Sequence, residues 1–156
     1  MFDTILGLPV HALVVHFVVV LVPLAAVGMI AVAVRPAWRR AYLPLVVACA
    51  TIGLAAVPVA TRSGQHLKER LNAGGIVAKQ IHDHEQMGKL VIYPTIALWV
   101  LAIALLWLDR RDGSKRATTV VAVLGVVAAL AAAAQVTVAG HLGSTAVWKC
   151  TIGACQ

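Results

Sequence analysis

The stretch that decides the fold is residues 12–34, ALVVHFVVVLVPLAAVGMIAVAV, which contains no Asp, Glu, Lys or Arg. About 20 consecutive apolar residues in a helix cross the hydrocarbon core of a bilayer. The stretch is long enough to do so, too long for the apolar part of a cleaved signal peptide, and has no basic leader. We therefore interpret it as a first membrane span that the protein keeps.

Three further apolar stretches follow, at about residues 41–60, 90–108 and 118–139. The chain of 156 residues is 61% hydrophobic and 12% charged, with a mean hydropathy of +0.90, which excludes an ordinary soluble domain. The predicted fold is all-α: one domain, an integral-membrane, up-down four-helix bundle. Because neighbouring helices can satisfy the carbonyls that a proline frees, we expect the prolines of the spans to kink the helices without ending them. These prolines are Pro23, Pro44 and Pro58.

The charges of the connecting loops predict the orientation. Basic residues gather in the first and third connections: Arg35, Arg39, Arg40, Arg110, Arg111, Lys115 and Arg116. By the positive-inside rule these loops are cytoplasmic and both termini are extracytoplasmic. The net charge of +7 is then explained by the basic loops that orient the protein and attract anionic lipid. The sequence shows no pattern of basic residues typical of nucleic-acid binding.

Residues 61–89, between the second and third spans, are predicted to form a helical hairpin that projects beyond the membrane. Gly74 and Gly75 interrupt a stretch whose apolar residues otherwise recur at helical spacing. The second and third spans are therefore expected to continue outside the bilayer and to meet at a turn.

The C-terminal part of the chain is predicted to leave the membrane as a short, turn-rich tail over residues 140–156. On the extracytoplasmic side, oxidation permits a disulfide between Cys150 and Cys155. Within the fourth span, Gln135 and Thr137 are expected to form hydrogen bonds between helices.

All six histidines lie at the ends of the spans that face away from the arginine-rich loops: His11, His16, His66, His82, His84 and His141. One histidine from each span, His11, His66, His84 and His141, lies about 25 residues, or about 37 Å of helix, from the cytoplasmic charges. His16 lies deeper. Imidazoles gathered in one membrane layer are suited to ligating a metal or haem, or to moving a proton.

Helix rotation limits how many of these rings can converge. His11 and His16 are separated by about 140° around a helix, and His82 and His84 by about 200°, so one member of each pair can point into the bundle. His66 and His82 have charged neighbours and are expected to be solvated.

Two kinds of cofactor fit a layer of this kind. A haem requires two axial imidazoles on opposite helices and small residues beside the plate, whereas copper or zinc requires three or four converging histidines. Small residues occur at Gly88, Gly140 and Gly143, near the candidate histidines, which favours haem. Hydrogen-bonded packing of the histidines, or contact with lipid headgroups, stays open as the alternative.

The sequence contains no nucleotide-binding glycine loop, no nucleophile elbow and no pair of carboxylates within a span. We therefore expect no enzyme activity from this chain on its own, although it can serve as a redox subunit of a larger enzyme.

Four short motifs, spread over nearly the whole chain, resemble a bacterial membrane family, domain-of-unknown-function family 2231. They are residues 8–17 (LPVHALVVHF), 63–67 (SGQHL), 84–88 (HEQMG) and 140–144 (GHLGS), the last followed by Val147 and Trp148. The chain departs from the family pattern at Ala12, where proline is frequent, and at Ser144, where glycine is usual. The resemblance implies that the motif histidines are His11, His16, His84 and His141.

The resemblance also implies a bacterial, multi-pass protein of the cell (inner) membrane. Some relatives join this domain to a Rieske-type iron–sulfur domain, which implies redox work by association. Partners of an electron-transport protein would be the bilayer, a quinone, and a respiratory or iron–sulfur protein, and a homo-oligomer is compatible with the alanine-rich helix faces.

Together these observations predict a membrane protein that binds haem b and transfers electrons. One axial ligand is expected from the first span, His16 or His11, and one from the third or fourth, His84 or His141. The remaining motif histidines would bind propionates or a quinone headgroup. Arg62 and Lys89 would pair with propionates or anchor the protein in the membrane. The alternatives are a copper or zinc site built from the same four histidines and a cofactor-free structural subunit of a larger membrane complex.

Overall fold

The computed structural model describes residues 4–5, 8–71, 75–111 and 113–151 of the chain. Its elements are β1 (Thr4–Ile5), β2 (Leu8–Pro9), α1 (Val10–Val34), the 3-10 helix η1 (Pro36–Trp38), α2 (Arg39–Leu71), α3 (Gly75–Leu90), α4 (Ile92–Arg110) and α5 (Lys115–Thr151). The two short strands pair antiparallel just before α1. Four helical segments of the described chain, α1, α2, α3 with α4, and α5, are long and apolar enough to cross a membrane. The predicted all-α, four-span fold is therefore confirmed.

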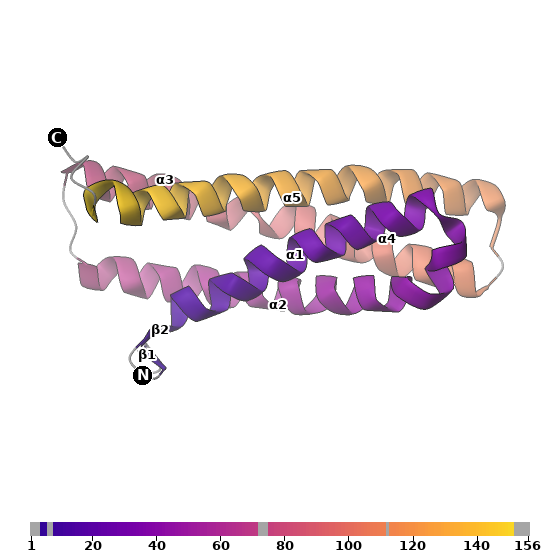
Figure 1. Ribbon diagram of the computed structural model, residues 1–156, viewed down its shortest axis with the longest axis horizontal. Helices are drawn as coiled ribbons and strands as arrows, with labels where there is room; N and C mark the ends of the chain where they lie inside the picture. Colours follow the sequence, from indigo (N-terminus) through magenta and orange to yellow (C-terminus); the bar gives the residue numbers. More distant parts are fainter. Residues whose placement is uncertain (1–3, 6–7, 72–74, 112, 152–156) are drawn as a thin grey trace.

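The helices run alternately up and down and form a bundle (Figure 1). α1 packs on α2 and α5, while α3 and α4 together pack on α5 and α2. Consequently α1 lies diagonally across the bundle from the α3–α4 segment. The start of α1 and the end of α5 lie at the same end of the bundle (Figure 1). The predicted extracytoplasmic location of that end remains a prediction from the loop charges.

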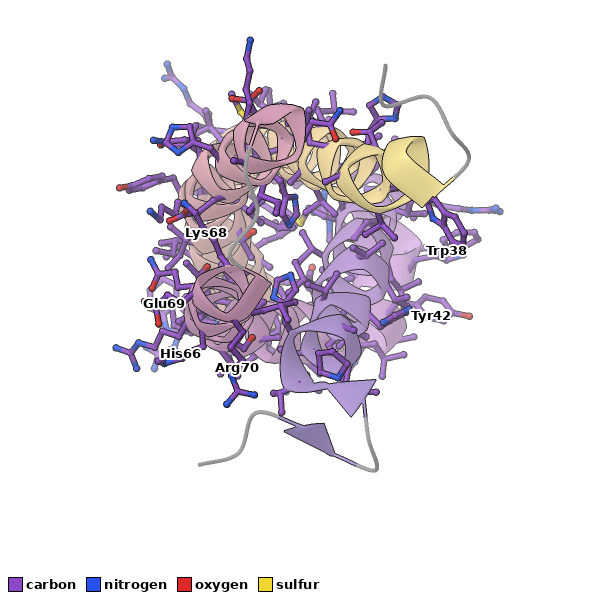
Figure 2. All side chains as sticks on the ribbon, turned by 90° about the vertical axis from the view of Figure 1, so that its left-hand side faces the viewer. Trp38, Tyr42, His66, Lys68, Glu69 and Arg70 are labelled. Atoms are coloured by element: carbon purple, nitrogen blue, oxygen red, sulfur yellow. The ribbon has the colours of Figure 1, made fainter. Side chains whose placement is uncertain are left out.

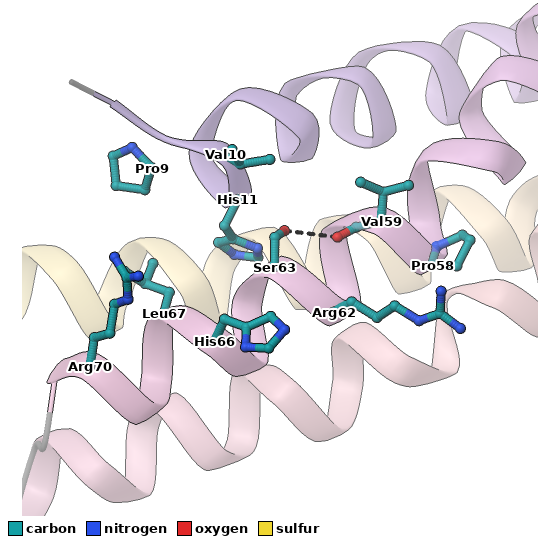
Figure 3. Close-up of a pocket in the computed structure, with 10 residues that line it drawn as sticks. All are labelled: Pro9, Val10, His11, Pro58, Val59, Arg62, Ser63, His66, Leu67 and Arg70. Carbon is teal, nitrogen blue, oxygen red and sulfur yellow. Dashed lines mark hydrogen bonds between the residues drawn. The ribbon is translucent and has the colours of Figure 1, made fainter. Parts of the chain in front are cut away.

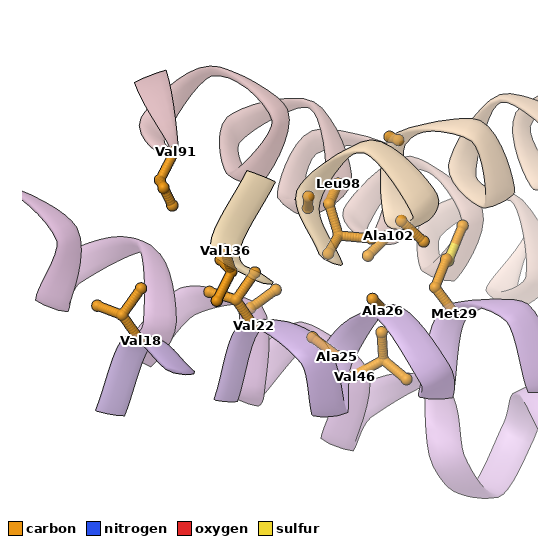
Figure 4. Packing of buried hydrophobic residues seen from close by; sticks show 14 of the residues in the cluster. Val18, Val22, Ala25, Ala26, Met29, Val46, Val91, Leu98, Ala102 and Val136 are labelled. Carbon is orange, nitrogen blue, oxygen red and sulfur yellow. The ribbon is translucent and has the colours of Figure 1, made fainter. Parts of the chain in front are cut away.

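The interior of the bundle is made of small and medium apolar side chains (Figure 4). Those buried along α1 are Val18, Val22, Ala25, Ala26, Met29 and Val32. Larger apolar side chains on the same helix, such as Phe17, Leu24 and Val27, are more than half exposed and are suited to contact lipid. Because lipid tails are as apolar as these side chains, burial alone does not drive the helices together, and small residues that permit close packing do so. Gly125 provides one such position, because a Cβ there would collide with the end of Met29.

The prolines of the first two spans lie inside continuous helices, as expected: Pro23 in α1, and Pro44 and Pro58 in α2. A discontinuity occurs instead at Val91, between α3 and α4, one turn before Pro94. Pro94 has no N–H, and its ring displaces the carbonyl four residues earlier, that of Leu90, which directly precedes the break. The Val91 N–H bonds to the Gly88 carbonyl, three residues back, at 3.3 Å.

Gln135 of α5 compensates for this discontinuity. Its side-chain Nε2 donates a hydrogen bond to the Met87 carbonyl at 2.9 Å, a group that Val91 would satisfy in a continuous α-helix. The predicted interhelical role of Gln135 is therefore confirmed. The same prediction for Thr137 is wrong, because its hydroxyl donates to the Ala133 carbonyl of its own helix at 2.9 Å. A threonine can always reach back to that carbonyl, and it does so here on an exposed face.

Replacement of Gln135 by leucine is expected to lower the free energy of unfolding by about 1 kcal/mol, because the Met87 carbonyl loses its donor in an apolar environment. Thr137→Val is the matched control, since the hydroxyl removed there bonds only within α5. Thermal unfolding in one detergent, followed by circular dichroism, makes the comparison. Equal midpoints for the two variants would contradict the role assigned to Gln135.

The predicted hairpin is present as two helical extensions. α2 continues to Leu71, and α3 begins at Gly75. Glu85 of α3 joins the extensions by accepting hydrogen bonds from Lys68 of α2 at 2.7 Å and from Lys89 at 2.6 Å. The turn at residues 72–74 lies outside the described residues.

The expectation of a turn-rich tail from residue 140 is wrong, because α5 continues without interruption to Thr151. Gly140 and Gly143 both lie inside this helix despite the low helix propensity of glycine, and Gly143 packs against the ring of His84. The proposed disulfide between Cys150 and Cys155 lies outside the residues whose side chains are described.

Candidate histidine site

Two of the six histidines lie partly inside the bundle, at the end where the chain begins. His11, in the first turn of α1, and His84, on α3, are half-buried. The other four side chains are exposed: His16, His66, His82 and His141. Since α1 and α3 are diagonal in the bundle, the two half-buried rings approach its axis from opposite corners.

The backbone of α2 holds the ring of His11. Its Nδ1 lies 2.9 Å from the Ala60 carbonyl oxygen. A Cβ on Gly64, one turn further along α2, would lie 2.9 Å from His11 Cε1 and 3.0 Å from Nδ1. The ring thus occupies the space that a side chain at residue 64 would fill. The glycine is what allows the imidazole to reach the carbonyl.

The ring of His84 is held by α5 in the same way. Its Nδ1 lies 2.9 Å from the Ala139 carbonyl oxygen. A Cβ on Gly143, again one turn further along, would lie 2.9 Å from His84 Cε1 and 3.1 Å from Nδ1. Both rings are therefore positioned by a helical carbonyl and by the glycine four residues after it.

The two supporting helices share a sequence pattern that reflects this arrangement. Residues 57–64 read VPVATRSG and residues 136–143 read VTVAGHLG, both of the form V-x-V-A-x-x-x-G. The matching positions have matching burial: Val57 and Val136 are each 3% exposed, and Ala60 and Ala139 are 8% and 7% exposed. The site is thus approximately two-fold symmetric. This repeat is the sequence signal for Gly64, a site residue that the single motifs do not reveal.

The geometry also fixes where the protons are. A carbonyl oxygen only accepts hydrogen bonds, so the Nδ1 atoms of His11 and His84 are the donors, which leaves Nε2 as the ring nitrogen that could ligate a metal. The ring centres are 6.1 Å apart and the ring planes are inclined by 77°. Histidines that ligate metals are oriented in this manner, with the second ring N–H donated to a backbone carbonyl or carboxylate. Two imidazoles, each held through Nδ1 by a helical carbonyl, therefore lie close together between α1 and α3.

Comparison with known proteins identifies the family. The model of a family of predicted membrane proteins, DUF2231, matches residues 7–156. The chain belongs to DUF2231. No match was found among the curated proteins or among the solved structures. The resemblance seen in the sequence motifs is thereby confirmed, and the chain is a multi-pass membrane protein.

The other histidines of this DUF2231 chain have different surroundings. His16 bonds through Nδ1 to the Ala12 carbonyl of its own helix. The Nδ1 atom of His66 lies 3.7 Å from the Oε2 atom of Glu69, and Figure 2 shows both side chains on the outside of the bundle. The Nε2 atom of His82 lies 3.4 Å from the side-chain Nε2 atom of Gln86. The structure thus does not bring His16 and His141 to the pair formed by His11 and His84.

Of the three glycines predicted to lie beside the site, one contacts a ring of the histidine pair. Gly143 contacts His84, whereas a Cβ on Gly88 or on Gly140 would have no neighbour within 4 Å. Gly88 is one turn from His84 along α3, but sequence proximity alone does not place a residue beside the ring. Neither glycine therefore contacts the histidine pair, and their predicted place beside a cofactor stays a prediction.

The donor set of the site consists of two imidazoles. No group of three or more His, Cys, Asp or Glu side chains that could hold a metal ion occurs among the described residues. A copper or zinc site usually needs three or four such ligands, whereas an iron held in a porphyrin needs only two axial ones from the protein. The described residues bring two imidazoles together, the number that an iron porphyrin takes from a protein.

Proposed function

We propose that this protein binds one haem b through His11 and His84 and transfers electrons at the histidine-bearing end of its membrane bundle. The observation that supports this is the 6.1 Å separation of two carbonyl-anchored imidazoles on diagonal helices. A ligating imidazole nitrogen lies about 2 Å from its metal, and the ring centre about 1 Å further, so two axial rings have centres about 6 Å apart. The separation of the pair matches this value.

The residues of the chain would act as follows. Ala60 and Ala139 hold the imidazoles through their carbonyls, and the N–H···O bonds raise the basicity of the Nε2 atoms that would ligate iron. Gly64 and Gly143 provide the space for the rings. Haem with both axial positions filled supplies one-electron chemistry and leaves no open position for oxygen.

A site near one membrane surface also has consequences for partners. His11 is the second residue of α1, so the pair lies near the end of the spanning segment. A partner that exchanges electrons with it, such as an iron–sulfur protein or a membrane quinone, would approach from that side. We infer that the protein works in this way in a bacterial cell membrane, with the redox chemistry completed by the partner.

The test is the visible spectrum of the purified protein, oxidised and reduced, after expression with ample haem and after reconstitution with haemin. We expect about one haem per chain, a six-coordinate spectrum, and no change on addition of carbon monoxide because both axial positions are filled. Metal analysis of the same sample is the control. A colourless protein with stoichiometric copper or zinc would refute the proposal, and a protein that takes up neither would favour a structural subunit.

A further inference from the structure

Gln80 of α3 carries a buried polar atom for which the protein itself supplies no partner. The residue is half-buried, and the Oε1 atom of its amide is buried with no hydrogen-bond partner among the described residues. The hydrogen bonds of His11 and His84 go to carbonyls of α2 and α5, so neither engages this atom. Buried polar atoms in native proteins nearly always have a partner, and an exception calls for an explanation such as a bound group.

Gln80 lies on the face of the α3–α4 segment that points into the bundle. Inward-facing residues recur along this segment at intervals of three and four: His84, Met87, Val91, Thr95, Leu98, Ala102 and Leu105. Residues with this spacing share one face of a helix. Gln80 continues the row one turn, or about 6 Å of helix, beyond His84. The amide therefore lies outward of the imidazole pair, toward the end of the bundle where the chain begins (Figure 1).

The approximate two-fold symmetry of the histidine site does not extend to Gln80. Four residues before His11, the position equivalent to Gln80 is Gly7, which has no side chain, and α1 begins only at Val10. A cavity of about 430 Å³ opens here between the start of α1 and α2, and His11 and Leu67 are among the residues that line it (Figure 3). The outer end of the site thus has an amide on the α3 side and an opening to the surface on the α1 side.

A primary amide is complementary to a carboxyl group. Its carbonyl oxygen accepts a hydrogen bond from a protonated carboxyl, and its NH₂ group donates to a carboxyl oxygen. Haem b carries two carboxyl groups, its propionates, at one edge of the macrocycle. Because a carboxyl is costly to bury among apolar helices, that edge belongs at the outer end of a membrane site. Lys89, from which a contact to a propionate was predicted, donates to Glu85 at 2.6 Å, whereas Gln80 Oε1 has no competing partner.

We propose that the side-chain amide of Gln80 binds a propionate carboxyl of the haem, and that the site thereby selects a porphyrin with free carboxyl groups. This inference rests on the proposed haem function. It gives the buried Oε1 atom a donor. It also gives the two-fold symmetric pair of imidazoles one polar side, so that the propionate edge of the haem has a preferred orientation.

The stability of the haem-free protein is the first test, because it separates a ligand contact from a structural one. Gln80→Leu and Gln80→Met remove an acceptor that has no partner, so we expect thermal midpoints equal to or above that of the unaltered chain. Gln86→Leu is the matched control on the same helix, where the side chain is exposed. A midpoint lowered by several degrees in both Gln80 variants, but not in the control, would show a structural contact and refute the inference.

The second test titrates the full-length apo-protein with haemin and with haemin dimethyl ester, in which both carboxyl groups are blocked. In both Gln80 variants, the preference for haemin over the ester should fall by about 5- to 10-fold, as expected for the loss of one hydrogen bond. Affinity for the ester itself should change by less than about twofold. Gln86→Leu should retain the full preference. A structural role of Gln80 would instead lower both affinities equally.

The outcomes distinguish this inference from the haem proposal on which it rests. If both porphyrins bind in a manner that requires His84, but Gln80→Leu and Gln80→Met keep the full preference for haemin, the carboxyl contact alone is refuted. If the unaltered chain takes up neither porphyrin, the haem proposal is refuted and this inference with it.

Discussion

Replacement of His84 by alanine is expected to lower the affinity for the proposed haem by more than about 100-fold. Loss of a ligand should cost more than the roughly 10- to 100-fold that follows when a ligand loses its hydrogen-bond partner. The variant removes one of the two imidazoles whose centres are 6.1 Å apart. His11→Ala should have the same effect, because the two positions are equivalent in the approximately symmetric site. The measurement is a haemin titration of the apo-protein, followed by the change in the visible spectrum.

The controls for this prediction are the histidines that the sequence placed in the same layer. His16→Ala and His141→Ala remove exposed side chains and should leave haem affinity within about twofold, as expected of surface substitutions. His84→Met adds a second readout, since a methionine ligand retains haem and raises the reduction potential. Loss of haem from the His16 variant, with normal binding by the His84 variant, would show that His84 is not a haem ligand.

Replacement of Gly64 or Gly143 by valine is expected to reduce haem affinity by about 10- to 100-fold without removing any ligand. A Cβ at either position would lie 2.9 Å from the Cε1 atom of the histidine that packs there. The ring must therefore leave its carbonyl, and its Nε2 loses its position. The same haemin titration measures this effect, and the potential of any residual haem should shift as well.

Matched controls exist on the same elements of the bundle. Gly88→Val, on α3, and Gly140→Val, on α5, introduce the same side chain where no atom lies within 4 Å of the new Cβ. Valine changes helix propensity equally at all four positions, so only the contact with the imidazole differs. If the control variants lost haem as strongly as Gly64→Val and Gly143→Val, the cause would be a general effect of valine on the helices and not a clash with the imidazole.

Much of the fold could be predicted because the bilayer imposes it. Residues 12–34 and the three later apolar stretches have the length that a membrane span requires, and the structure has helices at all four. The turn-rich tail was predicted incorrectly, because α5 continues past residue 140 to Thr151. Gly143 lies in helix α5 with a histidine ring packed against it, and this contact joins α3 to α5.

The sequence predicts how far along the bundle the candidate site lies, but not which histidines form it. Counting residues from the charged loops placed His11 and His84 at one depth, and the structure brings these two rings together. The same count placed His66 and His141 there, yet both side chains are exposed. Depth along a helix follows from the constant rise per residue, whereas the face that a residue presents depends on how the neighbouring helices are rotated.

The sequence by itself therefore determined the environment, the number of spans and the end of the bundle where the histidines gather, because apolar length and loop charge act locally along the chain. Only the tertiary structure decided that His11 rests on Ala60 and Gly64, and His84 on Ala139 and Gly143. These contacts join residues 49 and 55 positions apart. They exist because close helix packing brings a glycine and a helical carbonyl to each ring, a condition that no single segment of the sequence contains.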